Sequence, residues 1–191
     1  MRVLIRGIFS HKMPENSRFY TQKCRLLNHQ IFLFYFMQNL DCLNQVAEFH
    51  RTFKHPIIAT PQIPSKQRSD LRVSLIAEEL KELQEAIDNN DIVEVADALA
   101  DIQYVLAGAV LEFGLGEKFR ELFDEVQRSN MSKACHTVEE AAATIKHYEA
   151  KGTESYYKKI EGKFLVYRKG DDKTLKNINY SPADLKRILN P

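Results

Sequence analysis

Several features are scarce in this chain of 191 residues, and each scarcity excludes a class of protein. The three cysteines, Cys24, Cys42 and Cys135, are odd in number and lack metal-ligand spacing, so we expect reduced thiols in a cytoplasmic protein. Proline is absent between Leu71 and Pro182, which leaves that stretch free to form long helices. No apolar run approaches the roughly 20 residues of a membrane-spanning helix, so we expect no membrane partner.

An excess of charge of one sign is also lacking. The formal net charge is +1. Residues 1–37 carry six Lys/Arg and one acidic residue, so the remainder holds 21 Lys/Arg against 25 Asp/Glu, a balance of −4. This body of the chain shows no broad basic footprint, and on that count we expect no nucleic-acid partner.

Residues 1–36 differ in character from the rest of the chain. They are basic and irregular, and they end in the apolar run at 31–36. No small-residue cleavage site follows this run, so we do not interpret it as a signal peptide. An alternative is that Met37 is the true first residue of the protein. Because residues 1–36 differ from the rest, we treat them as an extension outside the core, and 37–191 as a helical domain whose lysine-rich tail begins at about residue 153.

Apolar spacing and turn residues predict the order of elements. We expect a helix over 40–53, an extended connector over the proline-containing residues 54–70, and two acidic helices between 75 and 114 joined at 88–91. A further helix over 117–127, a polar break at 128–133 and a helix opened by the capping box Thr137/Glu140 follow. In the tail, strand 163–168 would pair with 173–176, and Ser181 with Pro182 would start a last short helix.

The acidic helices are the most informative stretch. At about 100° per residue, each helix gathers its carboxylates within about 60° on one face. These residues are Glu78, Glu82 and Glu85, with Glu79 at their edge, in the first helix, and Glu94, Asp97 and Asp101 in the second.

The second acidic face belongs to a helix that is otherwise apolar almost all round. Such a helix is normally buried, and buried carboxylates are costly unless they are paired or bind a cation. The short connection at 88–91 predicts an antiparallel hairpin that brings the two acidic faces together. Oxygen ligands without His or Cys suit Mg²⁺ or Mn²⁺. The alternative is a solvated acidic stripe on a non-catalytic helical interaction protein.

The motif Glu-Glu-x-x-Glu at 78–82, followed by Glu-x-x-Asp at 94–97, resembles the MazG-like all-α nucleoside triphosphate pyrophosphohydrolases. Val-Ala-Glu-Phe-His at 46–50, Ser-Asn-Met-Ser-Lys at 129–133 and the segment 172–185 are similar to the branch with dimeric dUTPase-like and dCTPase-like members. The likeness covers roughly residues 40–189. One departure is the insertion-like segment at 156–170 before the lysine motif.

This resemblance implies an all-α fold, with an antiparallel four-helix-bundle-type core and a short C-terminal β-hairpin tail, assembled as a homodimer or homotetramer. The implied reaction is Mg²⁺-dependent hydrolysis of a (deoxy)nucleoside triphosphate to the monophosphate and pyrophosphate, with Mn²⁺ as a possible substitute. A phosphoribosyl-ATP pyrophosphohydrolase, which shares fold and chemistry, is the rival within the enzyme class.

The resemblance also implies roles for single residues. The metal ligands would be Glu79, Glu82, Glu94 and Asp97. Glu78 would be a further ligand or the group that activates water, so Glu78 and Glu79 are the expected catalytic residues. Asp101, one turn beyond Asp97, would orient a ligand or a lysine. The expected phosphate contacts are Asn130, Lys133, Lys173 and Lys176.

Overall fold

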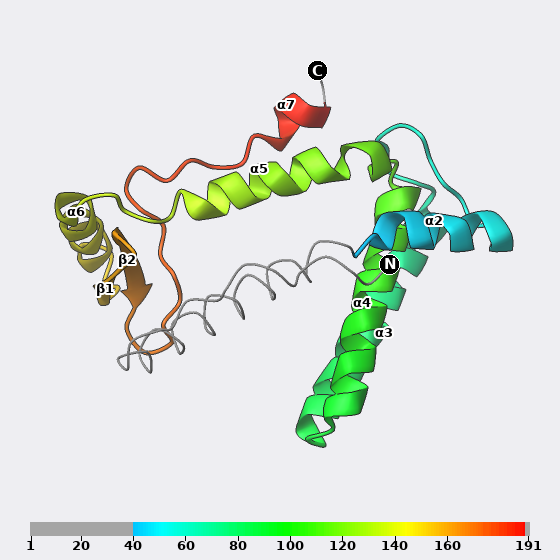
Figure 1. The fold of residues 1–191 in the computed structure, drawn as a ribbon, viewed down its shortest axis with the longest axis horizontal. Coiled ribbons are helices and arrows are strands. Elements are labelled where there is room, and N and C mark those ends of the chain that lie inside the picture. The colour runs from blue at the N-terminus through cyan, green and yellow to red at the C-terminus, as the bar shows by residue number, and fades with distance from the viewer. Residues whose placement is uncertain (1–39, 190–191) are drawn as a thin grey trace, which may run out of the picture. The chain divides into compact units, whose positions relative to one another are not determined.

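The computed structural model describes residues 40–189 (Figure 1), and the helices and strands from Cys42 onward belong to one unit. Its helices are α2 (Cys42–Phe53), α3 (Lys66–Asp88), α4 (Ile92–Glu112), the 3₁₀ turn η1 (Gly116–Lys118), α5 (Phe119–Met131), α6 (Val138–Glu149) and α7 (Leu185–Leu189). The strands are β1 (Ser155–Ile160) and β2 (Lys163–Arg168). The predicted extension over 1–36 and the alternative start at Met37 lie outside the described residues.

The two acidic helices form the predicted antiparallel hairpin, α3 beside α4 (Figure 1). Asp91 caps α4, because its carboxylate accepts the backbone N–H groups of Val93 and Glu94 at 2.9 and 3.2 Å. The prediction that the connector extends to residue 70 is wrong. Ser65, directly after the last proline, accepts the N–H of Arg68 and starts α3 at Lys66.

The connector packs along the C-terminal end of α4. The backbone N–H groups of Ile58 and Gln62 donate to the carbonyls of Leu111 and Phe113 at 3.0 and 3.1 Å. These carbonyls belong to the last turn of α4 and its cap, where helices leave acceptors unpaired. The connector therefore caps α4 from about 50 residues upstream.

Between α2 and α4 lies a small apolar core of Val46, Ala47, Ala107 and Leu111. Much of the α3–α4 hairpin outside this core stays exposed, although the sequence predicted a buried second helix. On α3 three exposed apolar side chains stand seven residues apart, Val73 (66%), Leu80 (60%) and Ile87 (54%), and Leu71 is exposed as well. On α4 the same spacing relates Ile92 (76%), Leu99 (52%) and Leu106 (39%), with Val93 and Tyr104 also exposed. The helical character is confirmed, whereas the four-helix bundle stays a prediction.

Helix α5 runs further than predicted. The polar break expected at 128–133 begins only after Met131, so Arg128, Ser129 and Asn130 are helical. The C-terminal tail holds two of these side chains: Arg128 donates to Ser181 Oγ, and Ser129 Oγ shares a hydrogen bond of 2.8 Å with Tyr180 Oη. Tertiary contacts thus override the local polar signal.

The C-terminal part is more than a hairpin tail. β2 pairs with β1, which lies in the insertion-like segment and was not predicted as a strand. The expected pairing with 173–176 is present only as an isolated bridge, with Leu175 N–H donating to Val166 O at 2.9 Å. Helix α6 covers one face of this sheet over a second core of Cys135, Ala141, Val166 and Leu175. Residues 134–177 thus form a helix-on-sheet unit with its own core.

Two predicted caps have opposite outcomes. The N-cap of α6 is confirmed: Thr137 Oγ1 accepts the N–H of Glu140 at 3.2 Å, while the Glu140 carboxylate accepts the N–H of His136, one residue before the cap, at 2.7 Å. The predicted start of the last helix at Ser181 and Pro182 is wrong, because α7 begins at Leu185, where the Asp184 carboxylate accepts the N–H of Arg187 at 3.1 Å. Arg128 and Ser132 engage Ser181 instead.

Between residues 40 and 189 no single helix is long and apolar enough to cross a membrane; α4 passes that test only when joined to Gly116–Met131, from which it is bent by 114°.

Candidate functional site

The hairpin places the predicted carboxylates of α3 opposite Asp97 and Asp101 of α4, along one seam, with Glu94 nearer the turn. Glu78, Glu79 and Glu82 lie on α3, and Glu94, Asp97 and Asp101 lie on α4. All are exposed in the single chain except Glu79, which is half-buried. The carboxylates on α4 are therefore more accessible than the sequence predicted.

Glu79 shows that the carboxylates act on one another. Partial burial and then the negative charges of Asp101, Glu82, Glu78 and Asp97 raise the pKa of Glu79 above its ordinary value. Charges from both helices therefore converge on this side chain. Glu94, nearer the turn, is not among these neighbours.

Within residues 40–189 no salt bridge balances the negative charge of the seam. None of the six carboxylates forms one, and the nearby Lys81 pairs with Glu85 at 3.2 Å instead. In this part of the chain no three His, Cys, Asp or Glu side chains lie close enough together, in their present positions, to coordinate a metal ion. The donor set nevertheless fits a hard divalent cation, because every donor is a carboxylate oxygen. A bound cation would offset the partial burial and the neighbouring negative charges that together raise the pKa of Glu79.

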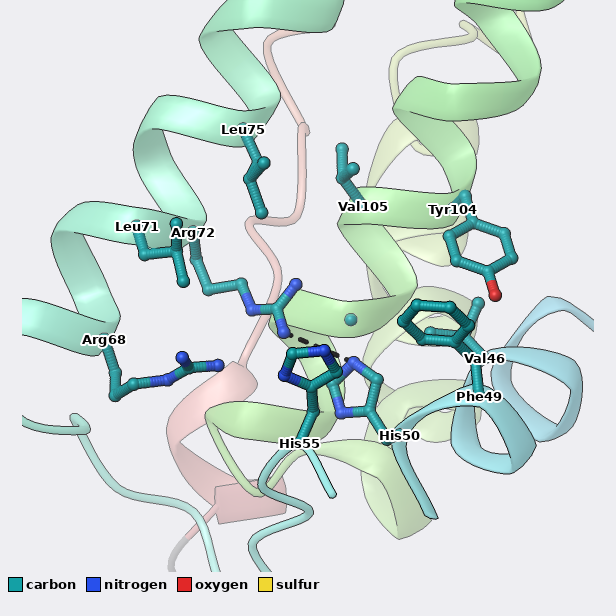
Figure 2. A pocket seen from close by; sticks show the side chains of 11 residues that line it. Val46, Phe49, His50, His55, Arg68, Leu71, Arg72, Leu75, Tyr104 and Val105 are labelled. Atoms are coloured by element: carbon teal, nitrogen blue, oxygen red, sulfur yellow. Dashed lines mark hydrogen bonds between the residues drawn. The ribbon is translucent and has the colours of Figure 1, made fainter. Parts of the chain in front are cut away.

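A cavity of about 240 Å³ continues the same seam towards α2 (Figure 2). Leu75 lies one turn before Glu79 on α3, and Val105 lies one turn after Asp101 on α4, and both line the cavity. The cavity therefore lies next to the carboxylates along both helices.

Aromatic rings form one side of this cavity (Figure 2). Phe49 and His55 are stacked, with ring centroids 5.7 Å apart and planes inclined by 14°. Tyr104 meets Phe49 edge-on, also at 5.7 Å. A flat ring can stack against such a wall.

The floor is a buried charge network that sequence reasoning missed. Glu112 is fully buried and accepts hydrogen bonds from Arg68 and Arg72, the latter at 2.5 Å. Burial alone would raise the pKa of Glu112, but the hydrogen bonds from the two arginines outweigh it and hold that pKa below its ordinary value. The only sequence signal is Arg68 and Arg72 one turn apart, since their partner is 40 or more residues away.

The same network fixes His50. Its Nε2 accepts a hydrogen bond from Arg72 at 3.3 Å (Figure 2). Its Nδ1 donates to the carbonyl of Pro56 at 2.8 Å. Burial, and then the charge of Arg72, lower the pKa of His50 despite the Pro56 hydrogen bond. His50 is therefore neutral at pH 7, with the proton on Nδ1.

Gly108 provides room for this network. A Cβ at that position would stand 2.7 Å from Arg72 Nη1 and 3.2 Å from His50 Nε2. Because Glu112 holds the Arg72 guanidinium in place, any side chain at 108 would displace it from the cavity floor.

The predicted phosphate-binding residues are not joined to the acidic seam. Lys133 donates to Asn130 Oδ1 at 2.8 Å after the end of α5, and Lys176 stacks on Tyr180, with its Nζ 4.4 Å from the ring centroid. Lys173 lies exposed beside β2. In residues 40–189, no hydrogen bond or ion pair links these side chains to the carboxylates of α3 and α4.

Residues 46–130 match the model of the phosphoribosyl-ATP pyrophosphohydrolase family, which belongs to the all-α nucleoside triphosphate pyrophosphatase-like proteins related to MazG. The match covers somewhat less than half of the chain, and it contains α3, α4, all six carboxylates and the cavity. It implies pyrophosphohydrolase chemistry on a nucleotide for this segment.

The chain is also similar to an uncharacterized protein of Acanthamoeba polyphaga mimivirus, with 34% identity over 92 residues. The similarity covers 46% of this chain and only 37% of the length of that relative.

Proposed function

We propose that this protein hydrolyses a nucleoside triphosphate between its α- and β-phosphates, releasing the monophosphate and pyrophosphate. The observation that carries the proposal is the continuous seam, in which a carboxylate cluster adjoins a ring-sized aromatic cavity. The family match over the same residues supports it.

We propose that Mg²⁺ is held by Glu79, Glu82, Glu94 and Asp97, with Asp101 orienting a ligand. When bound, the ion would neutralise the triphosphate and lower the pKa of the attacking water. The electrostatic reason for a cation is already present, because without one the seam would repel a polyanionic substrate.

The chain's own side chains would carry the remaining work. Glu78, exposed on α3, accepts a proton from the attacking water, whose oxygen then bonds to the α-phosphorus. The bond from that phosphorus to the bridging oxygen breaks, and pyrophosphate leaves with the oxygen. Phe49 and Tyr104 hold the base, which positions the α-phosphate over the seam.

The cavity size favours an ordinary nucleotide. A volume of about 240 Å³ is below the roughly 300–1,000 Å³ of sites for drug-sized ligands, so it suits one base. The second candidate, phosphoribosyl-ATP, is favoured by the description of the matching family. Its base carries an additional sugar phosphate, which would have to lie outside the cavity.

We further propose that a second copy completes the site. Both helices of the hairpin carry exposed apolar residues, three on each at a spacing of seven, and a row of this kind suits a helix that packs against a partner. Pairing two hairpins would bury this surface in a four-helix arrangement. It would also allow Asn130, Lys133, Lys173 and Lys176 of one copy to approach phosphates at the seam of another.

The proposal is tested by measuring pyrophosphate release with Mg²⁺ from the canonical and deoxy triphosphates and from phosphoribosyl-ATP. We expect turnover of at least one triphosphate and its loss in Glu82→Gln. Glu78→Gln should lower kcat by roughly 10²–10⁴-fold, the usual contribution of a general base.

The matched control is Glu85→Gln on the same helix, because Glu85 pairs with Lys81 and lies outside the proposed ligand set. It should leave turnover unchanged. Release of inorganic phosphate in place of pyrophosphate would contradict the proposed bond cleavage. Turnover of phosphoribosyl-ATP alone would select the second candidate.

A further inference from the structure

The face of the β1–β2 sheet that is turned away from α6 has a distinct chemistry. Directly paired residues on antiparallel strands share a face. The pairs Tyr157–Val166 and Lys159–Phe164 therefore belong to the α6 side, where Val166 and Phe164 join the core. The opposite face carries the pairs Tyr156–Tyr167, Lys158–Leu165 and Ile160–Lys163. We refer to these six residues as the tyrosine face.

Two aromatic rings lie side by side on the tyrosine face. The centroids of Tyr156 and Tyr167 are 5.8 Å apart, and their planes are inclined by 34°. Both side chains are half-buried, and Tyr156 Oη donates to Asp172 Oδ1 at 2.7 Å, which fixes that ring. The two rings thus form a small aromatic platform on the sheet, with Tyr156 held by Asp172.

Positive charge accompanies this platform. Between Ser155 and Lys169 the chain carries five Lys/Arg and one acidic residue, a balance of +4. Arg168 and Lys169 are paired with Asp171 and Glu154. Within the described residues neither Lys158 nor Lys163 forms a salt bridge, although the negative charge of Asp172 acts on Lys158. The Lys158 ammonium lies 5.4 and 5.5 Å from the centroids of the two tyrosine rings.

We propose that the tyrosine face binds single-stranded nucleic acid. Bases of a single strand stack on paired aromatic rings of a sheet, and adjacent ammonium groups neutralise the phosphates between them. On binding, Lys158 would exchange its contact with the rings for a phosphate. A duplex keeps its bases stacked inside, so it cannot use this platform.

This inference revises the expectation drawn from the charge of the whole chain. The segment 66–112, which holds both acidic helices, carries four Lys/Arg and 11 Asp/Glu, a balance of −7. In the net charge of the whole chain, this negative segment offsets the positive charge of the β1–β2 sheet. The β1–β2 sheet lies outside the residues that match the family. The inference does not depend on the proposed pyrophosphohydrolase activity.

The test measures fluorescence anisotropy of a labelled 12-nucleotide oligouridine with the full chain, in EDTA so that the acidic seam holds no metal. We expect saturable binding at 50 mM salt that weakens as salt rises. Loss of a stacking ring in Tyr167→Leu should weaken binding about fivefold to a hundredfold, and Tyr167→Phe, which keeps the ring, should restore it. Lys158→Ala should reduce the salt slope by about 0.7.

The chain supplies matched controls on the opposite face of the same strand, Lys159→Ala and Tyr157→Leu. Both should bind within about twofold of the unsubstituted protein, with folding verified by circular dichroism. The inference is overturned if no binding occurs at 50 mM salt, or if Lys159→Ala weakens it as much as Lys158→Ala. Equal competition by polyglutamate, by duplex of the same length or by free UMP would also overturn it, because stacked successive bases would then not be what is recognised.

Discussion

At the scale of single residues, Glu112 is the carboxylate on which the cavity floor depends. It receives hydrogen bonds from Arg68 and Arg72, and both it and Arg72 are buried. Removing its charge leaves the Arg72 guanidinium buried and unpaired, which typically costs about 3–5 kcal/mol. The single residue therefore links stability to the shape of the proposed base site.

We predict that Glu112→Gln lowers the melting temperature at pH 7 by about 6–20 °C, at roughly 2–4 °C per kcal/mol for a chain of this size. The folded-state pKa of Glu112 lies below its ordinary value, so its ion pairs stabilise the fold above the unfolded-state pKa. That stabilisation is lost as the pH falls through the folded-state value. Thermal melts from pH 7 to pH 3 should show the two proteins converging, and a constant difference would contradict the ion-pair explanation.

For Glu79 the effect of removing the charge on the melting temperature has the opposite sign. Its pKa is raised in the folded chain, so the metal-free protein loses stability as the pH rises from the ordinary carboxyl value through the raised one. Glu79→Gln should therefore melt about 1–4 °C higher than the unsubstituted protein in EDTA at pH 7, and no higher at pH 4. Added Mg²⁺ should raise the melting temperature of the unsubstituted protein and not that of the variant. A dose-dependent Mg²⁺ shift in both proteins would exclude Glu79 as a ligand.

At the scale of elements, the helix-on-sheet unit at 134–177 has a core separate from that of the helices. Val166 is fully buried at its centre. Val166→Ala should remove about 2 kcal/mol of apolar burial. In hydrogen-exchange mass spectrometry, amides of 134–177 should exchange faster while those of α3 and α4 are unchanged. Ile160→Ala, at a side chain 45% exposed, is the control, and faster exchange throughout would show that both cores unfold as one.

Local signals decided which elements the sequence could predict. The ends of α4 were visible because Asp91 caps its start and Gly114 follows its end. β1 was missed because its sequence, Ser-Tyr-Tyr-Lys-Lys-Ile, lacks an apolar–polar alternation. The turn Glu161–Gly162 joins β1 to β2, and both of its residues have positive φ angles, 48° and 80°. Of these two residues only the glycine indicates a turn in the sequence.

The candidate site divides in the same way. The shared face of the carboxylates could be predicted because helical spacing is a local property, and because the turn between α3 and α4 is short. The cavity could not, since its floor joins Arg68 and Arg72 to Glu112 across 40 or more residues, and its wall brings Phe49 of α2 to Tyr104 of α4. Such pairings leave no periodicity in the sequence.

At the scale of the whole molecule, the apolar stripes of α3 and α4 predict self-association. We expect light scattering after gel filtration to give at least twice the chain mass of 22.1 kDa. Leu99→Glu places a charge on the stripe of α4 and should yield the monomer. Thr52→Glu, on the exposed side of α2, is the control. A monomer in the unsubstituted protein would contradict the proposal, and turnover by a Leu99→Glu monomer would show that one copy suffices.

The backbone around Gly114 has a consequence for how this sequence can vary. Gly114 has φ +70°, and a Cβ there would meet the carbonyl oxygen of Thr60 at 2.0 Å, because the connector runs along the end of α4. Gly152, Gly162 and Gly170 also have positive φ, but a Cβ at each would have nothing within 4 Å. The three open positions can drift to asparagine or aspartate, which tolerate that backbone. Position 114 does not tolerate such a replacement: any side chain there would require the connector at Thr60 to take a different path past the end of α4.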